Sequence, residues 1–323
     1  MNSSPAQKFG LVKRGVLKPE FFWSYEVVKK VLFLLIFIIL SPIFALPVHS
    51  EKLSTPSGVT VEINYRVLQR GEVIVVRIND GWRVKEVQIQ FLENKYFMAK
   101  SKNNSSLLAF VGLDLNLEPG TYTMEFFIDK TSGGKEYIQT QIPILENKFP
   151  LRRLWVPKEF VVPPPEFHER IREEAEILRA LYGTITPRWH GEGRFILPSS
   201  GKVHKNFGDR RIFNDIKRST HGGMDITAPR GAPIIASNSG RIVLARDLYY
   251  AGKAVIIDHG LGLFSLSCHF SKITVEEGDL VRKGDLIGEI GATGRVTGPH
   301  LHWGVKVFGN RIDPFSLLSL NLD

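Results

Sequence analysis

The chain is poor in cysteine and contains no low-complexity segment. Cys268 is the single cysteine among 323 residues, so no disulfide can form within the chain. This absence excludes the small secreted modules that depend on several disulfides for their stability. The length is sufficient for two domains of ordinary size.

The sequence also lacks a long uninterrupted apolar run. The longest covers residues 31–40, and a second apolar stretch reaches Val48 after an interruption at Pro42. A run of this length is too short to cross a bilayer comfortably, and Pro42 would break a continuous helix. Because Lys29 and Lys30 stand directly before the run, the pattern favours a secretory signal with its N-terminus inside.

The leader leaves two interpretations open. The segment before the apolar run is long for a signal peptide, and no clean small-x-small cleavage site follows the run. We therefore predict that residues 1–50 are a signal peptide or a membrane anchor, with inner-membrane attachment through residues 31–48 in the second case. A later true start near Val27 or Val28 would explain the long leader. Either version delivers the rest of the chain to the periplasm or cell envelope.

Positive charge exceeds negative charge only modestly outside the leader. The formal net charge is +9, and the first fifty residues contribute +4 of it through six Lys/Arg and two Asp/Glu. The remaining +5 is compatible with attraction to an anionic polymer or a membrane surface. Basic and aromatic residues do not combine in the pattern typical of nucleic-acid binding, so we predict no nucleic-acid partner.

Residues 51–149 are predicted to form a β-sandwich. Short segments of alternating polarity, such as 84–91 and 122–128, are separated by turn sequences such as that at 79–81. Roughly six or seven strands at this spacing are typical of an immunoglobulin-like sandwich. Trp82 could fill the core of the sandwich or lie exposed beside its turn. Because no cluster of titratable residues occurs here, we interpret the region as a spacer or binding module.

Residues 150–194 are predicted to form a proline-rich linker and one helix. The prolines at 163–165 should be extended and stiff, whereas apolar residues recur at three- and four-residue intervals from about Glu166 to Tyr182. This helix should pack on the region that follows. From 195 to 323, glycine turns separate short apolar strands and predict an antiparallel β-sheet with a groove. The predicted fold class is therefore mainly β.

Two histidines near the C-terminus share one of these strands. His300 and His302 would project from the same face, while Leu301 and Trp303 turn toward a core. A His-x-His pair alone is weak evidence for a site, because most such pairs are accidental or structural.

Three upstream residues make this pair a candidate metal site. His221 and Asp225 are four positions apart, and the two glycines at 222–223 disfavour a helix, so we expect a turn that enters a strand. His269 supplies a further imidazole. Neutral imidazole nitrogens and one carboxylate are the ligand set of a catalytic zinc site that keeps one position open for water.

On these residues the chain resembles the lysostaphin-type peptidoglycan metallo-endopeptidases, which have the duplicated hybrid motif fold. The family pattern is His-x-x-x-Asp, a histidine in a short strand, and His-x-His after a Thr-Gly-x-x-x-Gly-Pro turn. Here it is found at His221–Asp225, at His269 and at Thr293–His302. The resemblance runs from about Phe195 to Leu318 and includes the segments 206–211, 258–260 and 275–288. It implies that residues 195–323 are a zinc metallopeptidase domain.

The resemblance also implies a role for five residues. His221, Asp225 and His302 match the family's zinc ligands, and His269 and His300 match its two non-ligand catalytic histidines. Peptide hydrolysis needs a base for the attacking water and a donor for the oxyanion and leaving amine. A metal ion nearby disfavours imidazolium, so at least one of the two catalytic histidines should be neutral. Which of them is the base stays open.

Other polar residues have less specific assignments. His259 belongs to the family's Asp-His-Gly turn and is interpreted as structural. Asn206, Arg210 and Arg211 match positions that line the family's groove, so they are candidates for substrate contact.

The predicted strand from Leu263 to Phe270 contains both His269 and Cys268. Alternation places Leu266, Cys268 and Phe270 on one face and His269 on the other. We interpret Cys268 as a small core residue, because a zinc-thiolate role would require this strand to bulge.

The sequence as a whole predicts an exported zinc-dependent endopeptidase that hydrolyses peptide cross-links of bacterial peptidoglycan, with Zn2+ as its cofactor. The alternative is a non-catalytic cell-wall-binding regulator of other peptidoglycan hydrolases, as degenerate relatives are. Such relatives usually lose ligands, and this chain retains the full set. A β-rich carrier domain, suggested by the segment 275–288, would need a modifiable lysine at a hairpin tip that the segment lacks. The cross-link cleaved and the oligomeric state stay open.

Overall fold

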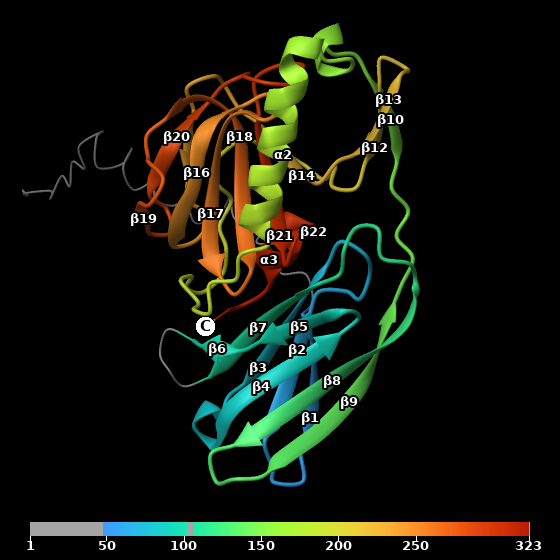
Figure 1. Ribbon diagram of the computed structural model, residues 1–323, viewed down its shortest axis with the longest axis vertical. Helices are drawn as coiled ribbons and strands as arrows, with labels where there is room; N and C mark the ends of the chain where they lie inside the picture. The colour runs from blue at the N-terminus through green and yellow to red at the C-terminus, as the bar shows by residue number, and fades with distance from the viewer. Residues whose placement is uncertain (1–47, 102–105, 323) are drawn as a thin grey trace, which may run out of the picture. The chain divides into compact units, whose positions relative to one another are not determined.

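The computed structural model describes residues 48–101 and 106–322, so the predicted leader lies almost wholly outside the described residues. The described chain is mainly β, as the sequence predicts, and its strands form four sheets (Figure 1). None of the described helices has the length and hydropathy of a membrane-spanning segment.

Two antiparallel sheets form the predicted sandwich. One has the strand order β1-β2-β3-β7-β6 and the other the order β5-β4-β8-β9. Side chains from both sheets, including Val61, Phe91 and Phe126, fill one shared core. Trp82 lies outside that core and is 76% exposed. The bounds are β1 (His49–Ser54), β2 (Thr60–Tyr65), β3 (Val73–Ile78), η1 (Gly81–Arg83), β4 (Val84–Phe91), β5 (Asn94–Phe97), β6 (Ala99–Lys100), β7 (Leu107–Gly112), β8 (Gly120–Lys130) and β9 (Lys135–Ile144).

A ten-stranded antiparallel sheet contains Asp225, His269 and His302, and His221 and His300 lie just before two of its strands. Its main path is β11-β14-β21-β18-β17-β16-β19, while β20 joins β15 to β18, and β22 pairs with β21. The bounds are β11 (Lys202–His204), β14 (Gly223–Thr227), β15 (Pro233–Ile235), β16 (Gly240–Leu248), β17 (Gly252–Gly260), β18 (Leu263–Ile273), β19 (Leu280–Val281), β20 (Leu286–Ile290), β21 (Leu301–Val307), β22 (Asn310–Ile312) and the helix α3 (Pro314–Ser319).

The predicted helix covers one face of this sheet. It is α2 (His168–Tyr182), and Figure 1 shows it lying across the sheet. Tyr182 at its end packs with Phe264 and Cys268 of β18, and Glu174 accepts hydrogen bonds from the backbone N–H of Tyr249. The helix therefore packs on the region that follows it, as predicted.

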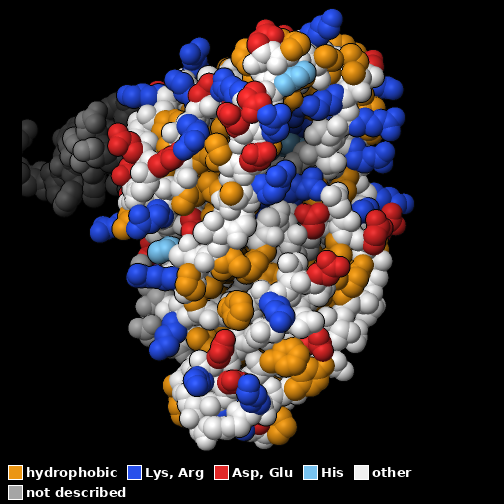
Figure 2. Space-filling model, viewed as in Figure 1, with side chains coloured by type: hydrophobic (Ala, Val, Ile, Leu, Met, Phe, Trp, Pro, Cys, Tyr) orange, Lys and Arg blue, Asp and Glu red, His pale blue; other side chains and the backbone are white. Residues whose placement is uncertain are grey.

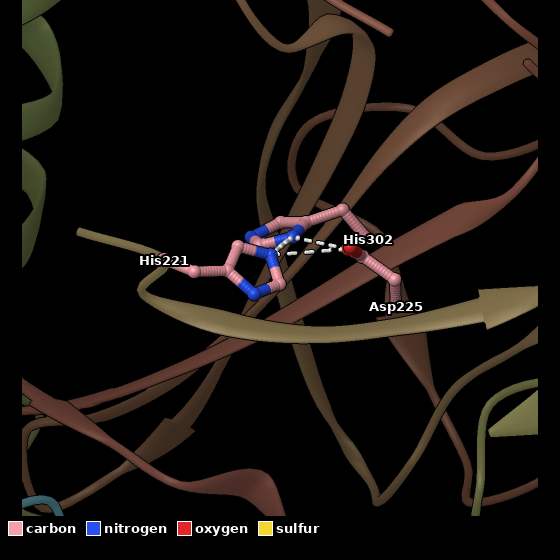
Figure 3. A group of neighbouring side chains, drawn as sticks. All are labelled: His221, Asp225 and His302. Atoms are coloured by element: carbon pink, nitrogen blue, oxygen red, sulfur yellow. Dashed lines mark hydrogen bonds and ion pairs between the residues drawn. The ribbon is translucent and has the colours of Figure 1, made fainter. Parts of the chain in front are cut away.

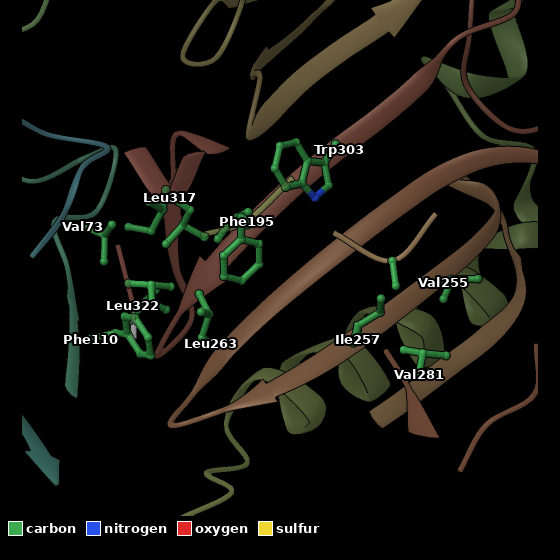
Figure 4. Packing of buried hydrophobic residues seen from close by; sticks show 14 of the residues in the cluster. Val73, Phe110, Phe195, Val255, Ile257, Leu263, Val281, Trp303, Leu317 and Leu322 are labelled. Atoms are coloured by element: carbon green, nitrogen blue, oxygen red, sulfur yellow. The ribbon is translucent and has the colours of Figure 1, made fainter. Parts of the chain in front are cut away.

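The sandwich strands β3 and β7 are buried on both faces. Within β3, Ile74 faces the sandwich core, whereas Val73 packs in the core of the ten-stranded sheet. Phe110 of β7 also packs in the core of the ten-stranded sheet (Figure 4). Figure 4 shows Val73 and Phe110 beside Leu317 and Leu322, close to the C-terminus. Double-sided burial explains why these two strands are nearly continuous apolar runs rather than strictly alternating ones. The predicted boundaries at residues 149 and 194 stay predictions.

Part of the predicted linker is a strand. β10 (Leu151–Leu154) runs parallel to β12 (Arg210–Phe213), and β12 pairs antiparallel with β13 (Lys217–Thr220) in a separate three-stranded sheet. Two 3-10 turns, η2 (Lys158–Phe160) and η3 (Pro165–Phe167), then lead into α2. The sequence predicts an extended linker, but the pairing with a segment almost sixty positions later has no local signal.

Candidate metal centre

Strand pairing brings Asp225 and His302 together. In the antiparallel pair of β14 and β21, these two residues are direct partners. His221 lies two positions before β14, in the two-residue connection that directly follows β13; the segment is not helical and enters a strand, as the sequence predicts, but no turn precedes His221. Gly223 is required there, because an added Cβ would lie 2.4 Å from the backbone oxygen of Trp303. Leu301 and Trp303 are fully buried in the core, so His302 points to the opposite face.

Three donor atoms converge at this place. His221 Nε2 lies 2.9 Å from His302 Nδ1 and 3.1 Å from Asp225 Oδ1, and His302 Nδ1 lies 3.0 Å from Asp225 Oδ1 (Figure 3). Figure 3 shows the three side chains pointing toward one another from separate parts of the chain. Ligands about 2.1 Å from a tetrahedral zinc ion would be about 3.4 Å apart. The donor set and its spacing therefore fit one divalent ion after a shift of a few tenths of an ångström.

Neighbouring groups orient two of the three donors. His221 Nδ1 lies 2.8 Å from the backbone oxygen of Asn206, which can only accept, so Nδ1 carries the proton and Nε2 the lone pair. Asn206 Nδ2 and Arg211 Nη2 donate to Asp225 Oδ2 at 2.8 and 3.0 Å, which leaves Oδ1 for the donor cluster. The sequence predicts Asn206 and Arg211 as groove-lining candidates for substrate contact. Both line it, but their contacts show that they also hold Asp225.

The carboxylate at this centre is ionised. Burial raises the pKa of Asp225, but the close contacts of its carboxylate with the His221 and His302 rings outweigh burial and hold the pKa well below its usual range. Burial and the nearby His221 lower the pKa of His302, against the opposing effect of Asp225. An ionised carboxylate beside an imidazole that favours its neutral form is the protonation state that metal ligands require.

His269 and His300 lie side by side next to the three donors. Their ring centroids are 4.9 Å apart, and His300 Nε2 is 3.8 Å from Asp225 Oδ1. Each ring donates its Nδ1–H to a backbone oxygen, that of Thr293 at 2.8 Å for His269 and that of Gly298 at 2.9 Å for His300. Burial, followed by the charges of His300 and His302, lowers the pKa of His269 to about 3. His269 is therefore neutral, with its lone pair on Nε2.

A β-bulge places His269 at the centre. Its φ is +69°, and two residues of β18 oppose one residue of β17 at this point, where the pairing register shifts. The bulge makes one sequence prediction wrong. Leu266 and Cys268 face the groove and the α2 side, but Phe270 turns into the opposite core, and His269 lies on the same side as Cys268. Simple alternation fails because the extra residue reverses the facing of everything after it.

The five residues line one groove of about 890 Å³. Its floor is the ten-stranded sheet, and one wall comes from the three-stranded sheet, including Arg152 and Leu154 of β10. Figure 2 shows Lys and Arg side chains gathered where Figure 1 labels β10, β12 and β13. Exposed arginines on the strands of this wall are Arg152, Arg153, Arg210 and Arg218, and of these four only Arg152 lines the groove. The groove is therefore open and large enough for a peptide, and a basic surface lies beside it.

Two other residues have structural environments. His259 is completely buried, and its Nδ1 and Nε2 lie 2.8 Å from the backbone oxygen of Ser239 and from Ser265 Oγ. Cys268 is 2% exposed, and burial raises the pKa of its thiol. Neither residue has the environment of a metal ligand.

The comparison with protein families matches this geometry. Residues 219–314 match the family described as peptidase family M23. These residues are a peptidase M23 domain. The finding confirms the resemblance to lysostaphin-type enzymes that the sequence predicts, and the M23 segment contains all five predicted site residues. Asn206 and Arg211 lie just before it.

Related proteins share this part of the chain. The peptidoglycan DD-endopeptidase ShyA of Vibrio cholerae is 40% identical over 121 residues, which cover 37% of this chain and 28% of that protein. The DD-carboxypeptidase/endopeptidase Mpg of Neisseria meningitidis serogroup B is 41% identical over 97 residues, which cover 30% of this chain and 22% of Mpg. The matches thus span less than a third of either relative.

One solved structure resembles more of the chain than the M23 segment. A Pseudomonas aeruginosa protein assigned to peptidase M23 superposes with a TM-score of 0.59 and 26% identity, covering 78% of this chain and 96% of that one. The likeness therefore extends beyond the M23 domain.

Proposed function

We propose that this chain is an exported zinc-dependent endopeptidase that hydrolyses peptide cross-links of bacterial peptidoglycan. The observation that carries the proposal is the convergence of His221 Nε2, Asp225 Oδ1 and His302 Nδ1 within 3.1 Å of one another. ShyA, which is named as a peptidoglycan DD-endopeptidase, supports the substrate class. The apolar segment 31–48, with lysines before it, supports export.

The three converging atoms would hold the zinc ion. When bound, zinc supplies Lewis acidity to a peptide carbonyl and to water in the groove. Asn206 and Arg211 keep Asp225 Oδ2 occupied, so that Oδ1 alone faces the two imidazoles. This support fixes the ligands before metal and substrate arrive, which reduces the reorganisation needed for catalysis.

His269 and His300 would move the protons of hydrolysis. Because Nδ1 of each ring is committed to a backbone oxygen, protons must enter and leave at Nε2. The neutral ring can accept a proton from the attacking water at Nε2, and the protonated ring can donate one to the leaving amine. The two rings act as a pair in this proposal, with no order assigned.

Alanine substitution of two ligands tests the proposal. Purified His221→Ala and Asp225→Ala proteins should each lose zinc, measured by elemental analysis, and should release no peptides from cross-linked sacculi. Asp80→Ala is a matched control, because Asp80 is a half-exposed residue of the sandwich; it should retain both properties. Hydrolysis that persists in either ligand variant contradicts the proposal. A wild-type protein that binds zinc and sacculi but cleaves nothing favours the non-catalytic regulator.

A further inference from the structure

Arg295 lies in the groove wall between β20 and β21, on the loop that leads to His300. Its backbone N–H donates to the backbone oxygen of Tyr250 at 2.9 Å. Its guanidinium carbon lies 4.5 Å from the centroid of the Phe213 ring and 4.9 Å from that of the Tyr250 ring. Two aromatic rings from different elements therefore hold the guanidinium in place, and the side chain is half-buried.

The charge of Arg295 has no acidic partner among the described residues. Two other arginines of the groove are each paired, Arg152 with Asp209 and Arg211 with Asp225. Aromatic rings that stack on a guanidinium leave its in-plane N–H groups free for hydrogen bonds. Burial and the nearby Arg211 lower the pKa of Arg295, as expected for a cation that lacks a compensating anion.

A second unsatisfied donor belongs to the same groove. Arg211 Nε is buried and has no hydrogen-bond partner in the part of the chain that the structure describes. Buried donors without partners are rare, so each requires an explanation. Arg211 also lines the groove, and its charge lowers the pKa of Arg295. The positive charges of the two guanidinium groups would favour an anion in the groove.

We propose that Arg295 forms a subsite that binds a free carboxylate of the substrate peptide beside the metal centre. This inference rests on the proposed function, since it names a feature of the peptide that the groove selects. The planar guanidinium matches a carboxylate with two parallel N–H···O bonds. The basic wall formed by β10, β12 and β13 would also attract an anionic peptide. The carboxylate could be at the C-terminus of the peptide or on a side chain.

Binding to metal-free protein tests the subsite separately from catalysis and from carboxylate binding by zinc. Three versions of one branched cross-linked peptide serve as probes: the free acid, the C-terminal carboxamide and the side-chain carboxamide. Calorimetry should show that wild type binds the free acid about tenfold or more tightly than one of the amides, which identifies the carboxylate used. Arg295→Gln should bind all three peptides equally weakly, and Arg295→Lys should retain part of the preference.

Arg230→Gln is the matched control. Arg230 is an exposed arginine outside the groove, and the variant has the same net charge as Arg295→Gln. It should discriminate between acid and amide as wild type does. The proposal is overturned if wild type shows no preference for the free acid, or if Arg295→Gln keeps the full preference.

Turnover measurements separate this proposal from the proposed function. With zinc-loaded protein, Arg295→Gln should raise KM for the free acid about tenfold or more. It should leave KM unchanged for the amide that wild type binds less tightly than the free acid. If wild type cleaves no peptide but still prefers the acid in the binding experiment, the endopeptidase proposal fails and the subsite stands. If wild type cleaves acid and amide equally well, the subsite fails and the endopeptidase stands.

Discussion

His259 and the histidines of the groove belong to the same part of the fold, yet their hydrogen bonds differ. The protein satisfies both ring nitrogens of His259, one with a backbone oxygen and one with a serine hydroxyl. Within the described residues, His221, His269 and His300 each give only Nδ1 to a backbone oxygen and direct no hydrogen bond from Nε2 to the main chain. The difference teaches that a histidine's role follows from how many of its nitrogens the fold leaves available.

The backbone carbonyls also decide which nitrogen is available. A carbonyl oxygen can only accept, so each of these bonds fixes the proton on Nδ1 and the lone pair on Nε2. The segment between β20 and β21 supplies two of these carbonyls, that of Thr293 to His269 and that of Gly298 to His300. The pairing of β17 with β18 also shifts register between Asp258 and Gly260, on either side of His259, so the hydrogen bonds of the ring nitrogens, rather than irregular backbone, distinguish the two kinds of histidine.

Metal removal should cause the largest loss of hydrolysis, because it deprives the groove histidines of the ion beside which they act. Treatment with a zinc chelator should lower sacculus hydrolysis at least about 1,000-fold, because the groove histidines alone provide no Lewis acid. Added Zn2+ should restore activity. Peptide release by protein shown to be metal-free would contradict the assignment.

Loss of a non-ligand groove histidine should come next. His269→Ala and His300→Ala should each lower kcat about 100- to 10,000-fold, the range of general acid–base catalysis. Zinc content, measured in the same preparations, should remain that of wild type, because neither side chain belongs to the converging donor set. A variant that loses zinc together with activity would instead be a ligand.

Asn206→Ala should have an intermediate effect. The substitution removes the hydrogen bonds of the Asn206 side chain to Asp225 and keeps the backbone bond to His221, so zinc affinity should fall about 10- to 100-fold. Competition with a chelator of known affinity measures the change. Asn214→Gly is the control, because within the described residues the Asn214 side chain bonds to the backbone of Val156 and not to the donor cluster. Equal zinc affinities in the two variants would show that Asn206 does not support the site.

His259→Gln should affect stability and leave catalysis unchanged. The variant leaves buried partners unsatisfied, so the free energy of unfolding should fall by about 1–3 kcal/mol while kcat/KM and zinc content stay at wild-type values. Denaturant titration and turnover assays measure these quantities. A loss of activity in folded His259→Gln would contradict a purely structural role for His259.

The pH dependence of stability sharpens the same contrast. Burial lowers the pKa of His259 from 6.5 to about 4 in the folded state. Between these values the unfolded chain binds more protons, so this residue makes stability fall as pH falls, by up to about 3 kcal/mol in total. Wild type should therefore lose more stability than His259→Gln between pH 6.5 and 4. Parallel curves for the two proteins would contradict the low pKa.

The sequence predicts the fold class and the five site residues, but not how the backbone supports them. Short strands, glycine turns and the alternation at 300–303 have local signals, so most strands of the ten-stranded sheet are found from sequence. The bulge has no such signal, because His269 takes a positive φ that histidine rarely adopts. The groove wall depends on parallel pairing of β10 with distant β12. The contacts of Asn206 with Asp225 and His221 likewise exist only after folding.

Anomalous diffraction at the zinc absorption edge, from crystals of the zinc-loaded protein, tests the central claim most directly. The account predicts one strong peak about 2.0–2.2 Å from His221 Nε2, Asp225 Oδ1 and His302 Nδ1. His269 and His300 should stand outside ligand distance of this peak. A zinc-loaded crystal with no peak among these three atoms, or with zinc bound by a different set of residues, would contradict it.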